Sequence, residues 1–136
     1  LEKKNLERQE IYKRITEKEC RYELYNDKEA DVFLVAYGTV ARIAKSVIEL
    51  AKQEGMKVGL IRPISLWPYP VEAFEKVMDR AKAFLTVEMS AGQMLEDVML
   101  TVNGRKPVYF HGRMGGMVPV RDDILAKLRE IKQKHA

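Results

Sequence analysis

The residue types best suited to acid–base chemistry follow one apolar run of this chain. Glu88 comes directly after the apolar residues 84–87, and Gln93 and Glu96 follow a few positions later. A carboxylate at the carboxyl end of a buried strand can act as a general base. It can equally hold a neighbouring loop by accepting hydrogen bonds from backbone N–H groups. Because no nearby residue completes a catalytic set, the pattern favours the structural role for Glu88.

A second candidate lies where another apolar run ends, at Gly38 and Thr39. Ligands of open parallel sheets gather at the carboxyl ends of the strands. We expect Thr39 to cap the helix that follows, whose free N–H groups can hold an anion. The further glycines of a phosphate-binding fingerprint are missing. Plain capping is therefore favoured, and ligand contact at these two residues stays open.

A third candidate is the glycine-rich segment 111–119, which contains His111, Arg113, Gly115 and Gly116. Glycine permits close approach of the backbone to a ligand, and arginine binds phosphate or carboxylate groups. A tight loop leading into a final helix would have the same composition. Contact with a ligand or partner and a purely structural loop are both compatible with this segment.

The segment 62–70 combines three prolines with Arg62, Trp67 and Tyr69. Each proline fixes φ and removes a backbone donor, so the sequence predicts a stiff, extended loop. Rigid aromatic residues often anchor protein interfaces. They can also pack a loop onto its own domain, and the sequence does not separate these two roles.

Several other kinds of site are excluded by the scarcity of cysteine and histidine. One cysteine, Cys20, cannot form a disulfide within the chain or a cysteine-ligated metal cluster. The two histidines, His111 and His135, are far apart in sequence and do not indicate a metal site. No G-x-S-x-G motif is present, which argues against a hydrolase. Low cysteine usage favours a cytoplasmic location.

The overall composition is that of a globular domain without nucleic-acid or membrane partners. The 136 residues are 46% hydrophobic and 32% charged, with a net charge of +4 that is spread among acidic residues. A nucleic-acid surface would show clustered basic residues. No apolar run approaches the roughly 18 residues of a membrane span, and the chain does not start with a signal-like segment.

The elements that must position the candidate residues alternate between strands and helices. Strands are predicted at residues 21–25, 32–37, 58–61, 84–87 and 108–110, and helices at 40–51, 70–81, 94–102 and 124–131. The run 32–37 is apolar on both faces, which is typical of a parallel strand between two helix layers. The alternation predicts an α/β fold, a three-layer α/β/α sandwich. We divide the chain into a lead-in helix or linker at 1–20 and one α/β domain at 21–136.

Five short motifs, taken in order, resemble the C-terminal region of the α-type subunit of 2-oxoacid:ferredoxin oxidoreductases. They are VAYGT at 35–39, VGLIRPI at 58–64, VEM at 87–89, GQMLEDV at 92–98 and GRMGG at 112–116. The match runs from about Tyr22 to Leu128, and residues 1–21 are similar to the segment before that domain. Residues 66–70 and 112–119 look most like the 2-ketoisovalerate (branched-chain) members, and the 2-oxoglutarate members are also similar. Ser90 and Ala91 depart from many relatives, which have an asparagine there.

The resemblance implies a transketolase-C-terminal-like fold with a mixed, mostly parallel five-stranded sheet, whose antiparallel strand would be 21–25. It also implies a parent enzyme that decarboxylates a 2-oxoacid on thiamine diphosphate and Mg. Electrons would pass through iron–sulfur clusters to ferredoxin, and the acyl group to coenzyme A. In this family the thiamine site belongs to pyrimidine-binding and diphosphate-binding domains outside this chain. No catalytic, cofactor-binding or metal-binding residue is therefore carried over.

The function predicted is that of a non-catalytic assembly domain, inactive on its own. Its expected partners are the pyrimidine-binding, diphosphate-binding, γ and ferredoxin-like parts of the oxidoreductase. The alternative is a small-molecule binding module that takes coenzyme A or an anionic effector at Gly38, Thr39 and Arg113. The candidates for interface or ligand contact are Gly38, Thr39, Arg62, Trp67, Tyr69, Glu88, Gln93, Arg113, Gly115 and Gly116.

Overall fold

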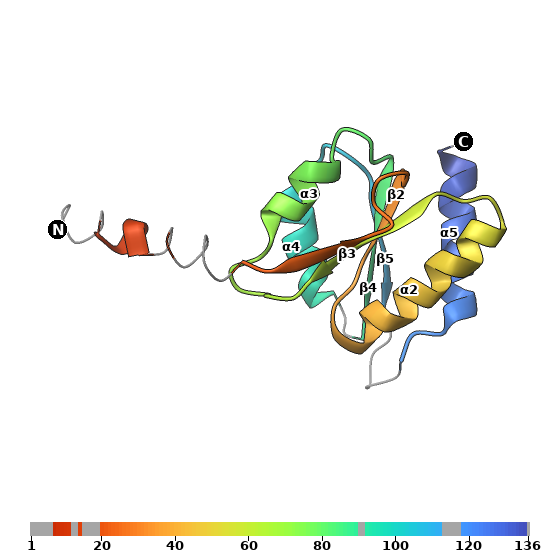
Figure 1. Cartoon of the computed structure of the whole chain (residues 1–136), viewed down its shortest axis with the longest axis horizontal. Helices are drawn as coiled ribbons and strands as arrows, with labels where there is room; N and C mark the ends of the chain where they lie inside the picture. The colour runs from red at the N-terminus through yellow and green to blue at the C-terminus, as the bar shows by residue number, and fades with distance from the viewer. Residues whose placement is uncertain (1–6, 12–13, 15–19, 90–91, 113–117, 136) are drawn as a thin grey trace.

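A five-stranded sheet forms the centre of the computed structural model of this chain (Figure 1). The structure describes residues 7–11, 14, 20–89, 92–112 and 118–135. The strands are β1 (Tyr22–Tyr25), β2 (Val32–Val35), β3 (Val58–Pro63), β4 (Ala83–Glu88) and β5 (Val108–Gly112). Their order across the sheet is β1-β3-β2-β4-β5, and all neighbours are parallel except β1, which is antiparallel to β3. The predicted antiparallel strand is thereby confirmed.

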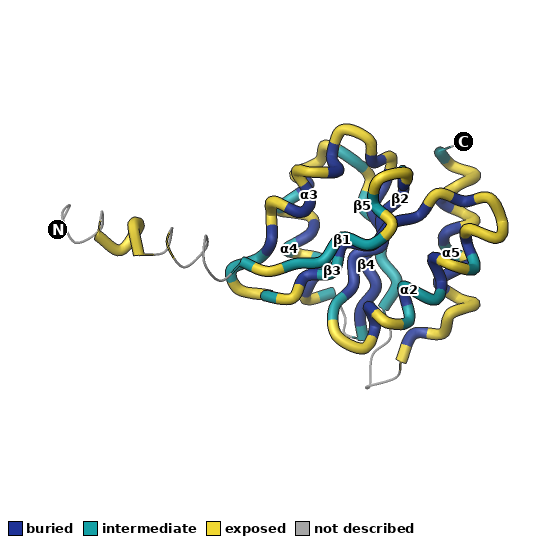
Figure 2. The backbone as a smooth tube through the Cα atoms, viewed as in Figure 1, coloured by how far each residue is buried: buried dark blue, intermediate teal, exposed yellow. Residues whose placement is uncertain are grey.

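Four helices cover the two faces of this sheet. They are α2 (Gly38–Gln53), α3 (Val71–Val77), α4 (Gln93–Val102) and α5 (Arg121–Lys134). Helices α2 and α5 share one hydrophobic core with the sheet, while α3 and α4 share the core on the opposite face. Figures 1 and 2 show the sheet between these two helix layers. The predicted three-layer α/β/α sandwich is confirmed.

Strand β2 shows why its sequence is apolar without interruption. All four of its residues are buried. Successive side chains of a strand point to opposite faces, so Phe33 and Val35 enter the core with α3 and α4, and Leu34 enters the core with α2 and α5. A central parallel strand with a helix layer on each face has no solvent-facing side.

Several predicted element ends differ from those observed by one to four residues, and two of them show the physical reason. Strand β5 continues to Gly112, two residues beyond the predicted end, because its partner β4 continues to Glu88 and the two residues are paired in register. Helix α3 begins after Pro70, which is its N-cap residue, and ends at Val77. The end of α4 was predicted correctly at Asn103, which takes the left-handed conformation that stops a helix.

The close approach of β3 to the residues that precede and form β2 depends on one glycine, Gly59. A Cβ atom at Gly59 would lie 2.9 Å from both the Cβ atom of Ala30 and the Cε1 atom of Phe33, and 3.1 Å from the carbonyl oxygen of Asn26. The Asn26 side chain also donates to the carbonyl of Val58 at 2.9 Å. Position 59 therefore has no room for a side chain.

Little of the predicted lead-in is described. Residues 7–11 are helical and exposed, as is residue 14, and the rest of 1–19 lies outside the described residues. Within the described part of the chain, no helix combines the length and apolar character needed to cross a membrane.

Candidate functional site

Glu88 is a fully buried carboxylate at the carboxyl end of β4. Its Oε1 atom accepts a hydrogen bond from the backbone N–H of Met94 at 2.8 Å, and Oε2 accepts one from the N–H of Leu95 at 2.9 Å. The N-cap residue of α4, Gly92, has no side chain that could accept those bonds. Glu88, which belongs to the neighbouring strand β4, thus caps the N-terminus of α4 in place of the N-cap residue. This agrees with its predicted structural role.

The other two polar residues predicted near Glu88 do not join it. Gln93 is the first residue of α4, and Glu96 lies in its first turn. Both are exposed, whereas Glu88 is buried. Glu96 lies near the positive end of the helix dipole, where a negative charge is favourable. The structure does not bring these three residues together as a catalytic set.

The sequence did not reveal a small acidic cluster around Glu88. Asp97 of α4 and the Tyr69 hydroxyl lie close enough to Glu88 for its charge to affect both. Burial raises the pKa of Asp97, and the negative charges of Glu96 and Glu88 raise it further. Burial also raises the pKa of Tyr69, again with contributions from Asp97 and Glu88. Tyr69 therefore stays protonated, although its hydroxyl has no hydrogen-bond partner among the described residues.

The predicted capping role of Thr39 is wrong. Helix α2 starts at Gly38, so its N-cap residue is Tyr37, and no side chain caps it. Thr39 is the second residue of the helix, two positions after the N-cap, so its hydroxyl cannot serve as the N-cap group. Gly38 and Thr39 are both exposed.

The remaining candidate loop is only partly described. Arg113, Gly115 and Gly116 lie outside the described residues. His111 belongs to the end of β5 and is half-buried. Contact of the 113–117 segment with a ligand or partner stays a prediction.

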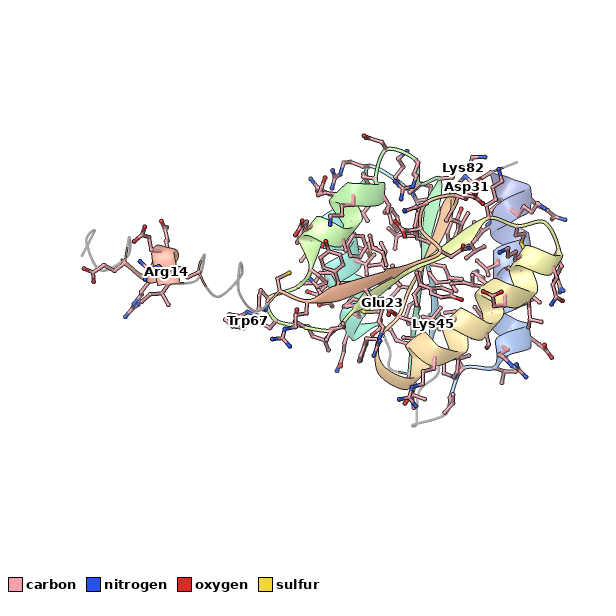
Figure 3. All side chains as sticks on the ribbon, in the orientation of Figure 1. Arg14, Glu23, Asp31, Lys45, Trp67 and Lys82 are labelled. Atoms are coloured by element: carbon pink, nitrogen blue, oxygen red, sulfur yellow. The ribbon has the colours of Figure 1, made fainter. Side chains whose placement is uncertain are left out.

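Arg62 forms an ion pair at the sheet edge. It lies opposite Glu23 in the register of β3 and β1, with Nη1 3.7 Å from Glu23 Oε1. Lys45 Nζ approaches the same oxygen at 2.7 Å. Hydrogen bonding from Lys45, together with the charges of Lys45 and Arg62, lowers the pKa of Glu23. Figure 3 shows Glu23 and Lys45 side by side.

The two aromatic residues of the 62–70 loop have different surroundings. The Tyr69 ring packs against Phe74 of α3, with 5.8 Å between ring centroids, and it belongs to the core on that face. Trp67 is 69% exposed. Tyr69 therefore packs on its own domain, whereas most of the Trp67 side-chain surface is exposed. Whether Trp67 contacts a partner stays a prediction.

A pocket of about 220 Å³ lies at the amino ends of the parallel strands, at the opposite edge of the sheet from Glu88. Its lining includes Lys57, Lys82, Lys132 and His135, together with apolar side chains such as that of Leu128. Lys82 Nζ lies 3.5 Å from Asp31 Oδ2. No pattern in the sequence indicated this pocket, because its lysines come from three distant segments.

The described residues contain no group of three or more His, Cys, Asp or Glu side chains placed to hold a metal ion. With one cysteine, the chain cannot supply the ligands of an iron–sulfur cluster alone.

Comparison with known proteins gives a consistent set of relatives. Residues 30–124 match the sequence profile of the pyruvate:ferredoxin oxidoreductase core domain II. The chain is 44% identical, over 131 residues, to the ketoisovalerate oxidoreductase subunit VorB of Methanothermobacter marburgensis, covering 96% of this chain and 37% of that protein. It is 29% identical, over 104 residues, to the 2-oxoglutarate synthase subunit KorA of the same organism, covering 76% of this chain and 28% of that protein.

Solved structures show the same fold. A 2-oxoglutarate:ferredoxin oxidoreductase from Magnetococcus marinus superimposes with a TM-score of 0.69 at 22% identity, covering 81% of this chain and 19% of that chain. A split-gene transketolase, solved as an inactive tetramer of four β subunits, also superimposes with a TM-score of 0.69. The identity is 17%, and the match covers 85% of this chain and 42% of that chain. These matches confirm the predicted transketolase-C-terminal-like fold. The chain spans little more than a third of the length of its VorB relative, and it belongs to the pyruvate:ferredoxin oxidoreductase core domain II family.

Proposed function

We propose that this chain is a non-catalytic assembly domain of a 2-oxoacid:ferredoxin oxidoreductase whose substrate is 2-ketoisovalerate. One observation carries the proposal: the similarity to VorB covers almost the whole chain at 44% identity. The similarity to the 2-oxoglutarate subunit KorA is lower, at 29%, and shorter. The chain accordingly resembles the branched-chain members more closely.

The chemistry of the described residues supports a role outside catalysis. The one fully buried carboxylate among them, Glu88, uses both oxygens to hold α4. The Glu88 carboxylate therefore has a structural task at the junction between β4 and α4. Thiamine diphosphate and Mg would be held by the pyrimidine-binding and diphosphate-binding parts of the enzyme. The iron–sulfur clusters that pass electrons to ferredoxin would belong to other domains or subunits, including the γ and ferredoxin-like ones. The complete enzyme would work in the cytoplasm.

Domain deletion in the complete enzyme tests this proposal. The subunit is expressed with and without residues 21–136, together with its partner subunits. We expect the shortened subunit to fail to assemble, and the isolated 136-residue chain to bind no thiamine diphosphate in a calorimeter. The intact complex should reduce an electron acceptor with 2-ketoisovalerate and coenzyme A faster than with 2-oxoglutarate. Tight thiamine diphosphate binding by the isolated chain would show that the domain is part of the active site.

A further inference from the structure

We infer that four exposed apolar side chains, three from one stiff loop and one from the first residue of α3, form the docking surface for the remainder of this chain's own subunit. The residues are Ile64, Leu66, Trp67 and Val71, here called the 64–71 patch, and they are 53%, 46%, 69% and 46% exposed. The inference rests on the proposed function, since it names the surface through which the domain would assemble. Exposed apolar residues are ordinary when scattered over a surface, but these four fall within eight successive positions of the chain, and a group of such residues marks an interaction site.

The loop that carries the patch is held in place by hydrogen bonds at its base. The backbone carbonyl of Arg21 accepts bonds from the N–H groups of Ile64 and Ser65 at 3.0 and 3.1 Å. The Ser65 hydroxyl accepts a bond from the Arg21 N–H at 2.9 Å and donates to the carbonyl of Pro68 at 3.0 Å. Prolines restrict the backbone further. A surface that is already ordered loses little entropy on binding.

Tyr69 explains why Trp67 faces outward. Its ring is fixed against Phe74 in the core, and the carbonyl of Tyr69 accepts a bond from the Val71 N–H at 2.9 Å. The loop is thus anchored on either side of Trp67, by Ser65 before it and by Tyr69 after it. Tryptophan is the residue type most enriched among those that dominate binding energy in interfaces.

The position of the patch points to a partner on the same polypeptide. Arg21, which forms the base of the loop, is the residue through which the chain enters β1, and the Cys20 thiol lies 3.9 Å from the carbonyl of Tyr69. Figure 3 shows Trp67 at the side of the domain where this entry occurs, away from Lys82. Cys20 and Arg21 therefore place the chain entry beside this loop, so a domain joined to the chain ahead of residue 20 would be tethered near the patch. A partner tethered by a short linker is present at millimolar effective concentration.

The extent of the patch also favours a tethered partner over a second copy. A stable interface between free proteins uses about 20–30 residues a side, many more than four apolar side chains and their rim. This chain covers 37% of its VorB relative, so most of that protein's length lies outside the matched domain. The partner that fits is a domain with a shallow apolar surface, surrounded by polar groups, carried by the same subunit.

The test uses Trp67 as a unique reporter, because it is the only tryptophan of the chain. The chain is labelled with 5-fluorotryptophan and mixed with the preceding part of its subunit, expressed separately, at concentrations approaching the millimolar level that the tether would provide. We expect the fluorine resonance to shift on binding. Calorimetry should show Trp67→Ser binding about 30-fold more weakly, the loss typical of a dominant interface residue. Leu66→Ser should also bind more weakly.

Leu100→Ser is the matched control, because Leu100 is an equally apolar, 78% exposed residue of α4 outside the patch. It should bind within about twofold of the unchanged chain. Circular dichroism establishes that each variant is folded. If the preceding part binds all variants equally, or leaves the resonance unchanged, the patch is not the docking surface, although the assembly role stands. Absence of binding by the unchanged chain, or a dimer of the chain alone that Trp67→Ser abolishes, also overturns the inference.

Discussion

Glu88 shows how a residue that looks catalytic in the sequence can be structural in the fold. It follows a buried strand, as a general base would, but the two N–H groups that it accepts from belong to α4. Leaving such groups buried without a partner costs free energy, so the carboxylate stabilises the junction between β4 and α4.

We expect Glu88→Gln to lower the free energy of unfolding by about 1–3 kcal/mol, because the amide NH₂ would face a backbone donor. Urea denaturation measures this as a lower midpoint at unchanged slope. Glu96→Gln, an exposed change on the same helix, should stay within about 0.5 kcal/mol. Equal losses in the two variants would contradict the capping role of Glu88.

Glu23 gives the chain one pH-dependent contribution. Lys45 and Arg62 lower its pKa in the folded state. The stabilisation is therefore complete above the pKa that Glu23 has in the unfolded chain, and it is lost as the pH falls through the lower, folded pKa. Because Glu23 and Lys45 are each about one-third exposed, we expect less than about 1 kcal/mol.

The measurement compares the unchanged chain with Glu23→Gln at neutral and at acidic pH. The difference in unfolding free energy between them should be present at neutral pH and vanish in acid. Glu29→Gln, at an exposed position, should show no such trend. If the difference in unfolding free energy grew on acidification, the pKa of Glu23 would be raised in the folded state, and the proposed effect of Lys45 and Arg62 would be refuted.

At the scale of elements, the approach of β3 to its neighbours depends on the missing side chain of Gly59. Ala30 and Phe33 fill the space that a Cβ atom would need. Both belong to the core shared with α3 and α4, so they have few directions in which to move.

Gly59→Ala should therefore destabilise the chain by about 1–3 kcal/mol, the usual result of overpacking. Phe33→Leu should also destabilise it by removing packed volume. Combined, the two should cost less than their sum, because the smaller residue makes room for the new methyl group. Thermal or urea denaturation of the four proteins measures this coupling, and strict additivity would refute the steric explanation.

At the scale of the whole molecule, one sheet with a core on each face joins the elements from β1 to α5 into a single unit. Residues 7–11 are exposed. The boundary near residue 20 stays our proposal.

A chain starting at Cys20 should unfold at the same midpoint as the longer chain, within a few degrees, if 1–19 is a lead-in segment. A chain starting at Asn26 should be far less stable, since it lacks β1 and the Arg21 anchor of the 62–70 loop. Scanning calorimetry compares the three. A large loss on removing 1–19 alone would place the boundary earlier.

Local patterns in the sequence predicted most of the fold correctly. Apolar runs such as 32–37 predicted the buried strands, although β2 ends at Val35, and the Asn103-Gly104 pair predicted the end of α4. Thr39 was assigned wrongly, because the start of a helix can shift by two residues without changing its apolar pattern. The end of β5 was missed because strand length depends on the partner strand.

By itself the sequence determined the alternation of strands and helices, the lack of a cysteine-ligated cluster, and the family through its ordered motifs. These properties depend on local periodicity and residue types. Only the tertiary structure decided that Glu88 caps α4, that Tyr69 faces inward while Trp67 faces outward, and that Gly59 leaves no space. Each of these depends on which residues distant in sequence meet across the sheet, and periodicity carries no information on that pairing.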